Sequence, residues 1–227
     1  MAHTATVFID GESGVGKTVL TRRFTSGLEA LAPDALLFSG RCHERESVPY
    51  KAVDGIIDAL SRYLKRESAD SRLISPSDRG LLGQVFPVMR RVETIARAPR
   101  QELSQLDPHA LRKRVFSALR TLFTRLAERN PLVLTIDDLQ WADADSLSLL
   151  AEVLRAPNEP HLLLVATVRA ASEHDAGNRR VQQLASIVSG DVRTLHLGPL
   201  PADDARALAT TLLQTTGAIS DAHAAAI

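Results

Sequence analysis

The residues best suited to chemistry in this sequence form a glycine-rich octapeptide near the N-terminus, Gly11-Glu-Ser-Gly-Val-Gly-Lys-Thr18. Its three glycines leave successive backbone N–H groups uncovered, so these groups can surround a dense anion. The ammonium of Lys17 can reach the terminal phosphates of a nucleoside triphosphate, and the Thr18 hydroxyl can contact Mg²⁺. The candidate binding residues are Gly11, Glu12, Ser13, Gly14, Val15, Gly16, Lys17 and Thr18, of which Thr18 is also a candidate metal ligand.

The spacing of this octapeptide matches the phosphate-binding P-loop, a glycine followed after four residues by Gly-Lys-Ser/Thr. By composition alone, the pattern is expected in on the order of one chain in a hundred of this length. Here an apolar stretch precedes it and helical spacing follows it, which is the strand–loop–helix setting that the motif requires. A helix that begins at the loop adds free N–H groups and partial positive charge. A glycine-rich turn with a fortuitous lysine is the alternative.

Two acidic residues follow an unbroken apolar run at residues 132–136, and they are the second candidate group. A strand covered on both faces has this composition, and in an open parallel sheet its last residues lie beside the P-loop. Asp137 is therefore a candidate Mg²⁺ ligand, usually through water. Asp138 is a candidate to orient or deprotonate the attacking water. Strands often end in Asp, however, and a capping role is the alternative for Asp138.

Three further charged residues follow predicted strands. Arg169 ends the run at residues 162–168, at the carboxyl edge of the predicted sheet, where a guanidinium could contact a γ-phosphate. A surface arginine leaving a strand is the alternative. Glu44 and Glu46 follow another strand, at a place where some P-loop ATPases carry their catalytic glutamate, but we favour solvated loop charges.

These residues need a sheet to position them, and the sequence predicts one. Five apolar stretches have strand character: residues 5–10, 35–41, 132–136, 162–168 and 192–197. Amphipathic helical spacing separates them, as in Leu20, Phe24, Leu28 and Leu31, and Asp107-Pro108 is a typical helix start. A last helix is expected from about 201 to 216, with Gly217 as its stop.

Strands that alternate with helices pair in parallel through crossover connections. We therefore predict an α/β P-loop NTPase fold: an open, mostly parallel five-stranded sheet with helices on both faces. Residues 67–105 break the alternation and contain Pro76, Pro87 and Pro99, which indicates a helical insertion with loops. The predicted core spans residues 1–200.

Composition narrows the class of protein. The formal net charge is zero, which gives no reason to expect nucleic-acid binding, and the basic run at residues 112–114 is interpreted as a solvated helix face. The single cysteine suits a reducing compartment. The N-terminus does not have the composition of a signal peptide, and apolar runs such as residues 161–168 are too short to span a bilayer. We expect a soluble, cytoplasmic protein with no membrane partner.

Five segments together resemble a known family: residues 11–18, 40–50, 137–143, 167–169 and 195–201. They look like the AAA-type ATPase module of large bacterial signalling proteins, of the class called STAND. Residues 40–50, Gly-Arg-Cys-His-Glu-Arg-Glu-Ser-Val-Pro-Tyr, resemble members linked to serine/threonine kinases, adenylate cyclases or helix-turn-helix regulators. The P-loop is generic, whereas Asp-Asp-Leu-Gln-Trp-Ala-Asp at residues 137–143 is fairly specific.

The resemblance implies a function and roles for residues. It implies ATP and Mg²⁺ as ligands, and the sequence lacks the Asn-Lys-x-Asp motif that reads guanine. It implies a regulatory switch, in which nucleotide binding changes the packing of a helical lid and slow hydrolysis resets it. Arg169 takes the sensor role toward the γ-phosphate, and Asp138 activates water. The expected partners are other domains of a larger signalling protein.

The chain also departs from the family pattern. Members have a segment before the first strand that helps to hold adenine, and they continue into a winged-helix lid and repeats. Here the first predicted strand begins near Met1, and residues 201–227 look like the start of a truncated lid. Two other hypotheses stay open: a motor or loader ATPase acting on DNA or protein, and a non-catalytic interaction module.

Overall fold

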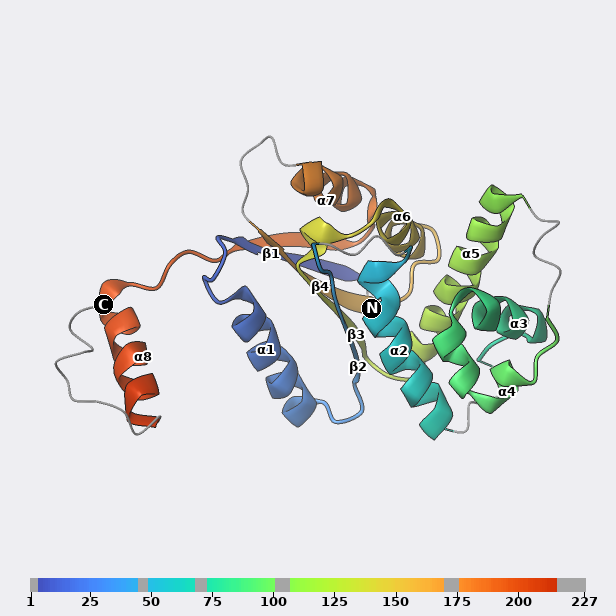
Figure 1. Cartoon of the computed structure of the whole chain (residues 1–227), viewed down its shortest axis with the longest axis horizontal. Helices are drawn as coiled ribbons and strands as arrows, with labels where there is room; N and C mark the ends of the chain where they lie inside the picture. Colours follow the sequence, from blue (N-terminus) through green and yellow to red (C-terminus); the bar gives the residue numbers. More distant parts are fainter. Residues whose placement is uncertain (1–3, 45–48, 68–72, 101–106, 170–175, 216–227) are drawn as a thin grey trace.

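The computed structural model describes residues 4–44, 49–67, 73–100, 107–169 and 176–215. Its centre is a five-stranded sheet in the order β2-β3-β4-β1-β5, with every neighbouring pair parallel (Figure 1). The strands are β1 (Ala5–Gly11), β2 (Leu36–Arg41), β3 (Leu132–Asp137), β4 (Leu162–Arg169) and β5 (Asp191–His196). The predicted parallel five-stranded sheet is confirmed, and each strand lies within about one residue of its predicted bounds.

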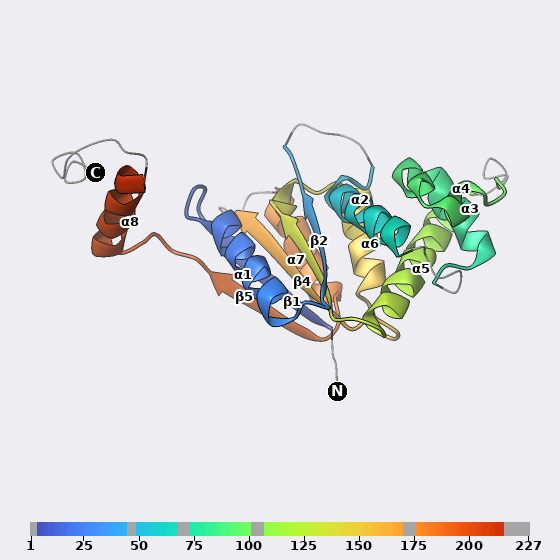
Figure 2. The same cartoon turned by 90° about the horizontal axis from the view of Figure 1, so that it is seen from below.

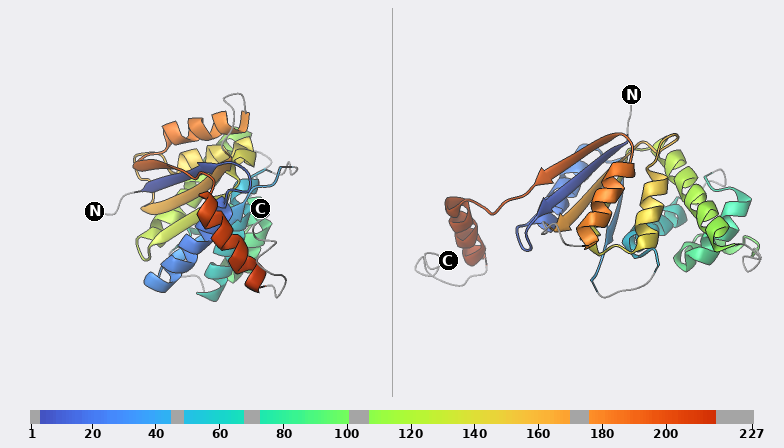
Figure 3. Two further views of the ribbon diagram at one scale, coloured as in Figure 1. Left: turned by 90° about the vertical axis from the view of Figure 1, so that its left-hand side faces the viewer. Right: turned by 90° about the horizontal axis from the view of Figure 1, so that it is seen from above.

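Helices cover both faces of the sheet, as predicted. The helices α1 (Lys17–Leu31) and α2 (Lys51–Arg66) lie on one face (Figure 2). The helices α6 (Ala144–Val153) and α7 (Ala176–Ile187) lie on the other (Figure 3). Since all the strands run in the same direction, their carboxyl ends meet at one edge of the sheet, where the P-loop and the acidic residues come together.

The region after α2 is helical, as the proline-rich stretch indicated. It contains α3 (Pro76–Val85), the 3₁₀ helix η1 (Pro87–Arg91) and α4 (Glu93–Ala96), followed by the long helix α5 (Pro108–Ala127). Asp107 caps α5, accepting a hydrogen bond from the Ala110 N–H at 3.2 Å, as the Asp-Pro start predicted. This helical region packs against α2 and α5 at the β2 end of the molecule (Figure 1).

The hydrophobic core lies between the β2-β3-β4 end of the sheet and the helices α2, α5 and α6. Its fully buried side chains include Ile57, Leu60, Leu119 and Leu134. Cys42, which follows β2, is also buried, and burial raises the pKa of its thiol to about 12. A thiol in such a place is protonated and inert at neutral pH, which agrees with a structural role.

The opposite end of the molecule is sparsely covered. Every side chain of the edge strand β5 is exposed. The helical spacing of Leu20, Phe24 and Leu31 did predict a helix, but these three side chains of α1 are 41%, 41% and 86% exposed. The last described helix, α8 (Ala202–Thr215), projects away from the sheet on an extended connection (Figures 1 and 2). Gly217, the predicted stop of this helix, lies outside the described residues.

No helix within the described ranges is both long and apolar enough to cross a membrane. The division into a core at residues 1–200 and a lid from residue 201 stays a prediction.

Candidate functional site

The P-loop forms the turn between β1 and α1 and has the backbone conformation of an anion cradle. Gly14 and Gly16 have φ values of +83° and +106°, in the left-handed region that glycine adopts without strain. The helix α1 begins at Lys17, and its N-cap residue is Gly16, which has no side chain that could cap the helix. The first N–H groups of the helix are therefore available to a bound anion.

Gly11 is required for a different reason than Gly14 and Gly16, because another segment of the chain approaches it closely. A Cβ at this position would lie 2.5 Å from the carbonyl oxygen of Leu197, in the connection between β5 and α8. The Leu197 N–H in turn donates to the carbonyl oxygen of Asp10 at 2.8 Å. The connection that leads to α8 is thus packed against the first residue of the P-loop.

Lys17 holds the loop in shape. Its side chain is buried, and its ammonium donates to the carbonyl oxygens of Gly11 and Glu12, both at 2.7 Å. Burial lowers the pKa of Lys17, while the nearby carboxylate of Asp138 opposes this by raising it. The ammonium therefore lies between the backbone of the loop and the acidic residues at the end of β3, where it can meet a phosphate.

Asp137 joins the P-loop helix to the central strands. Its carboxylate accepts hydrogen bonds from the Thr18 hydroxyl at 2.9 and 3.1 Å and from the Thr167 hydroxyl at 2.6 Å. These three residues come from α1, β3 and β4, which are brought together by the parallel order of the sheet. The predicted pair of Mg²⁺ ligands, Thr18 and Asp137, is in direct contact.

Asp138 lies beside them in an uncommon backbone conformation. Its φ and ψ are +59° and +44°, which turns the chain sharply at the end of β3. Its N–H donates to the Thr167 hydroxyl at 2.9 Å, and its carboxylate accepts a hydrogen bond from Gln140 at 3.2 Å. The guanidinium of Arg41, at the end of β2, lies 3.4 Å from the same carboxylate. Asp138 is thus held from three sides at the carboxyl edge of the sheet.

Asp143 is the last residue of the segment 137–143, here called the acidic loop, and it fixes the position of that end of the loop. Its carboxylate caps α6 by accepting from the Ser146 N–H at 2.8 Å, and it also accepts from the N–H groups of Tyr50 at 3.3 Å and Lys51 at 3.0 Å. Burial raises the pKa of Asp143, but the hydrogen bonds from Ser146, Tyr50 and Lys51 lower it more, so the net shift is downward. The starts of α2 and α6 are therefore tied together by one carboxylate.

The other predicted charges are placed less centrally. Arg169 is exposed at the end of β4, and its N–H donates to the Gln140 side chain at 3.1 Å. It is close enough to Lys17 for its charge to lower the pKa of that residue. Glu44 is exposed in the segment after β2, and Glu46 lies outside the described residues.

The oxygen donors at this edge suit a hard cation. The Thr18 hydroxyl and the Asp137 carboxylate are the oxygen types that Mg²⁺ prefers. No group of three or more His, Cys, Asp or Glu side chains that could hold a metal by themselves occurs in the described part of the chain. Mg²⁺ is commonly bound by one or two protein oxygens together with substrate phosphates, and Thr18 and Asp137 could supply such oxygens.

Sequence reasoning missed three residues of the site: Arg41, Gln140 and Thr167. All three contact Asp137 or Asp138. Arg41 and Thr167 lie in the last two or three residues of their strands, so a search of all the strand ends could have found them. Gln140 contacts both Asp138 and Arg169 through the 3₁₀ turn η3 (Leu139–Trp141), which the sequence pattern did not indicate.

Comparison with known proteins gives one family. Residues 2–165 match the family described as AAA ATPase domain. Among curated proteins, the chain is 25% identical over 192 residues to the uncharacterized protein R02095 of Rhizobium meliloti (strain 1021). That match covers 82% of this chain but 19% of the relative, so the chain spans only a small part of that protein's length.

Two solved structures are similar to this chain at low identity. The Walker-type ATPase PABY2304 of Pyrococcus abyssi is 14% identical with a TM-score of 0.50, and the match covers 96% of this chain and 56% of that one. A STAND protein with a tetratricopeptide repeat sensor, PH0952 of Pyrococcus horikoshii, is 15% identical with a TM-score of 0.43, covering 97% of this chain and 24% of that one.

Proposed function

Because the chain belongs to the AAA ATPase domain family, we propose that it binds ATP with Mg²⁺, hydrolyses it slowly, and serves as a regulatory switch domain in a larger signal-transduction protein. The observation that carries this proposal is the direct contact of Thr18 with Asp137, next to the buried ammonium of Lys17. The unit of β1, the P-loop and α1 supplies Thr18 and Lys17, and β3, the next strand but one from β1, supplies Asp137. Together they offer a place for phosphates and for a divalent cation.

The binding step uses residues of the P-loop. No side chain caps the start of α1, so the first N–H groups of this helix can donate to phosphate oxygens. Lys17 would exchange its two carbonyl partners, or share them, for oxygens of the β- and γ-phosphates. Mg²⁺ bound at Thr18 and Asp137 would supply neutralisation of the charge that develops on the phosphates.

The hydrolytic step assigns a role to Asp138. Its carboxylate orients a water molecule and accepts its proton while the water oxygen bonds to the γ-phosphorus and the bond to the bridging oxygen breaks. Asp138 already has Gln140 and Arg41 as partners, so it must exchange at least one of them for water. That competition supports slow turnover. Arg169, at the end of β4, would contact the γ-phosphate.

The switch proposal rests on the connection between β5 and α8. Leu197 is hydrogen-bonded to Asp10 and packed against Gly11, so a change in the P-loop acts on the start of this connection. The exposed side chains of Leu208 and Leu212 on α8 could pack differently when the loop changes. We propose other domains of a larger protein as the partners that read this change, in keeping with the small share of the curated relative that the chain covers.

The first test is calorimetric titration with ATP and Mg²⁺ of the parent and of Lys17→Ala. We expect binding by the parent and no measurable binding by the variant, because the variant lacks the ammonium that meets the phosphates. Lys65→Ala, an exposed lysine of α2, is the matched control and should bind like the parent. Circular dichroism must show that Lys17→Ala is folded. If a folded Lys17→Ala titrates like the parent, the P-loop assignment fails.

The second test separates the candidate catalytic acids. Asp138→Asn should keep ATP binding and lose phosphate release, since the amide can hold the geometry but accepts no proton. Glu44→Gln should retain turnover. The reverse outcome would assign water activation to Glu44. Competition between ATP and GTP in the same assay tests whether the site prefers adenine to guanine.

A further inference from the structure

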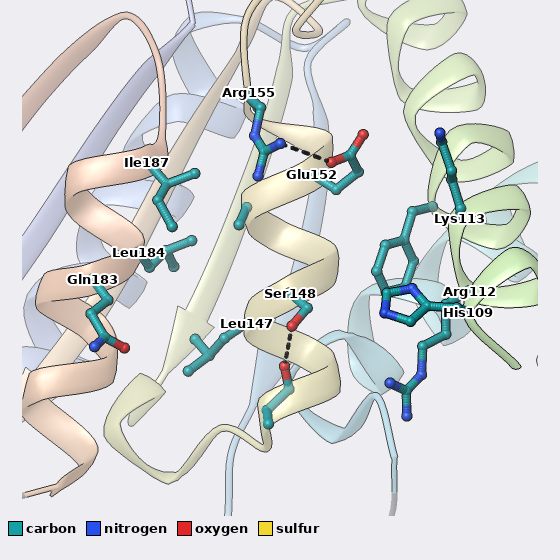
Figure 4. Close-up of a pocket in the computed structure, with 13 residues that line it drawn as sticks. His109, Arg112, Lys113, Leu147, Ser148, Glu152, Arg155, Gln183, Leu184 and Ile187 are labelled. Carbon is teal, nitrogen blue, oxygen red and sulfur yellow. Dashed lines mark hydrogen bonds and ion pairs between the residues drawn. The ribbon is translucent and has the colours of Figure 1, made fainter.

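A groove separate from the nucleotide site lies between the helices α5, α6 and α7. Its volume is about 580 Å³, within the range of small-molecule pockets. Figure 4 shows α6 in the middle, with residues of α5 on one side and residues of α7 on the other. None of the P-loop residues and neither Asp137 nor Asp138 lines it. A ligand there would occupy a different place from the nucleotide.

The floor of the groove is largely apolar. Phe116, Leu147 and Leu184 contribute to it, and Ile187 stands at its rim with its side chain 40% exposed. Ser148 is the polar residue of the α6 floor, but its hydroxyl donates to the carbonyl oxygen of Ala144 at 2.7 Å. Covering this hydroxyl therefore leaves no unsatisfied donor, and an apolar body can lie on it at small cost.

The rim of the groove is cationic. Arg112, Lys113 and Arg155 line it together with the carboxylate of Glu152, and Arg112 is ion-paired with Asp145 at 3.1 Å. Lys113 is exposed, and no carboxylate in the described ranges forms an ion pair with it. Figure 4 shows Lys113 and Arg155 at the same end of the groove, on either side of Glu152.

The ion pairs at this end leave room for an added anion. Arg155 lies 3.7 Å from Glu152, and Arg120 lies 3.8 Å from the same side chain. If Arg155 turned toward a ligand, Glu152 would keep Arg120 as its partner. An anionic group held by Lys113 at this end would then gain Arg155 as a second cation, while Glu152 kept Arg120 as its partner.

From these observations we propose that the groove binds an amphipathic organic anion. Its aromatic or aliphatic body would lie on the apolar floor of α6 and α7. Its carboxylate, sulfonate or phosphate would contact Lys113, with Arg155 turned toward it from Glu152. This binding goes beyond the proposed nucleotide function and does not depend on it. The site adjoins that function through α6, whose first turn is capped by Asp143 of the acidic loop.

The test uses 8-anilinonaphthalene-1-sulfonate, an aromatic body with one anionic group, as a probe in the absence of nucleotide. We expect saturable fluorescence enhancement with one site per chain. In an NMR titration, the shifted amides should belong to α5, α6 and α7. The neutral analogue N-phenyl-1-naphthylamine should bind at least about tenfold more weakly, since it gains nothing from the two cations.

Two pairs of variants locate the site. Ser148→Phe places a ring on the exposed floor and should abolish saturable binding, whereas Ser26→Phe, an exposed serine of α1, should not. Lys113→Glu should weaken binding about tenfold or more, and Lys65→Glu, with the same charge change on α2, should leave it unchanged.

Three outcomes would overturn the proposal. Amide shifts on α1 and β5 would show that the probe prefers the exposed apolar side chains of that edge. Equal binding by Ser148→Phe and the parent would place the site elsewhere. Equal binding of the neutral analogue would remove the anion from the proposed ligand class.

Discussion

The β2-β3-β4 end of the sheet and the β5 end differ in how completely they are covered. All but the last residue of β3 are buried, and α2, α5 and α6 pack around that end. All six residues of β5 are exposed, and α1 and α8 present Leu31, Leu208 and Leu212 to solvent. The proposed nucleotide site lies at the boundary between these ends, because β1 and α1 flank the P-loop while β3 and β4 provide its acidic and hydroxyl partners.

This difference indicates that the two ends of the sheet are stabilised in different ways. The covered end can hold Asp137, Asp138 and Thr167 in place by packing and by the hydrogen bonds among them. The helix α1 has few contacts of its own with the sheet, so a bound phosphate and cation would contribute much of what fixes its start. We therefore expect mutations to be costly at the covered end and ligand effects to be concentrated at the open end.

The largest difference in the free energy of unfolding is expected between two leucine truncations, one at the covered end and one at the open end. Leu119→Ala in α5 removes a side chain with 0% exposure, and we expect a loss of about 2–5 kcal/mol in the free energy of unfolding. Leu31→Ala in α1 removes one with 86% exposure and should change it by no more than about 0.5 kcal/mol. Urea unfolding followed by circular dichroism measures both. Equal losses would break the comparison.

A nucleotide should stabilise the open end, if the proposed binding holds. Mg²⁺–ADP at one hundred times its measured Kd should raise the free energy of unfolding by about 2.7 kcal/mol, because it binds only the folded chain. In hydrogen exchange, protection should increase mainly in α1 and the P-loop. Lys17→Ala should show neither change. Protection confined to α5 and α6 would contradict the expected division.

Removal of the Asp143 carboxylate tests a polar anchor of the covered end. Asp143→Ala should cost about 1–2 kcal/mol near neutral pH, because the variant loses the cap of α6 and the acceptor for the N–H groups of Tyr50 and Lys51 at the start of α2. Thermal unfolding at pH 7 gives the size of the loss. An unchanged midpoint would show that the two helix starts are held together by packing.

The same residue predicts a pH dependence. The pKa of Asp143 is lowered in the folded chain from the ordinary value of 3.8, so its contribution to stability is present above that value. It should be lost as the pH falls below 3.8 through the folded pKa. Asp143→Asn should therefore show a shallower fall in stability with acidification than the parent in parallel unfolding series. Curves with the same slope would contradict this.

The smallest effect is expected at the boundary itself. Arg41→Gln removes a half-exposed guanidinium 3.4 Å from Asp138 and should change the free energy of unfolding by less than about 1 kcal/mol. Arg62→Gln, which removes an exposed ion pair with Asp58 on α2, is the matched control. A much larger loss for Arg41→Gln in urea unfolding would mean that Asp138 depends on it for its place.

The sheet and the P-loop could be predicted from the sequence because both depend on local patterns of residues. Glycine spacing, an apolar run and Asp-Pro depend on neighbouring residues only, and they predicted β1, the P-loop and the start of α5. The contacts of Thr167 and Arg41 with the two aspartates join segments separated by many residues, so the local sequence alone does not predict them, although both residues lie at strand ends. Gln140 contacts Asp138 two residues away, but the 3₁₀ turn that brings them together had no recognised pattern. The exposed stripe of α1 could not be predicted either, since spacing indicates a helix but not what covers its face.

The buried cysteine has a practical consequence for experiments on α8. The chain has one cysteine, Cys42, whose thiol is enclosed by the core and protonated at neutral pH. A maleimide dye should therefore react selectively with a second cysteine introduced on the surface, for example Leu212→Cys. A fluorophore at that place would report the position of α8 in real time without removal of the native thiol.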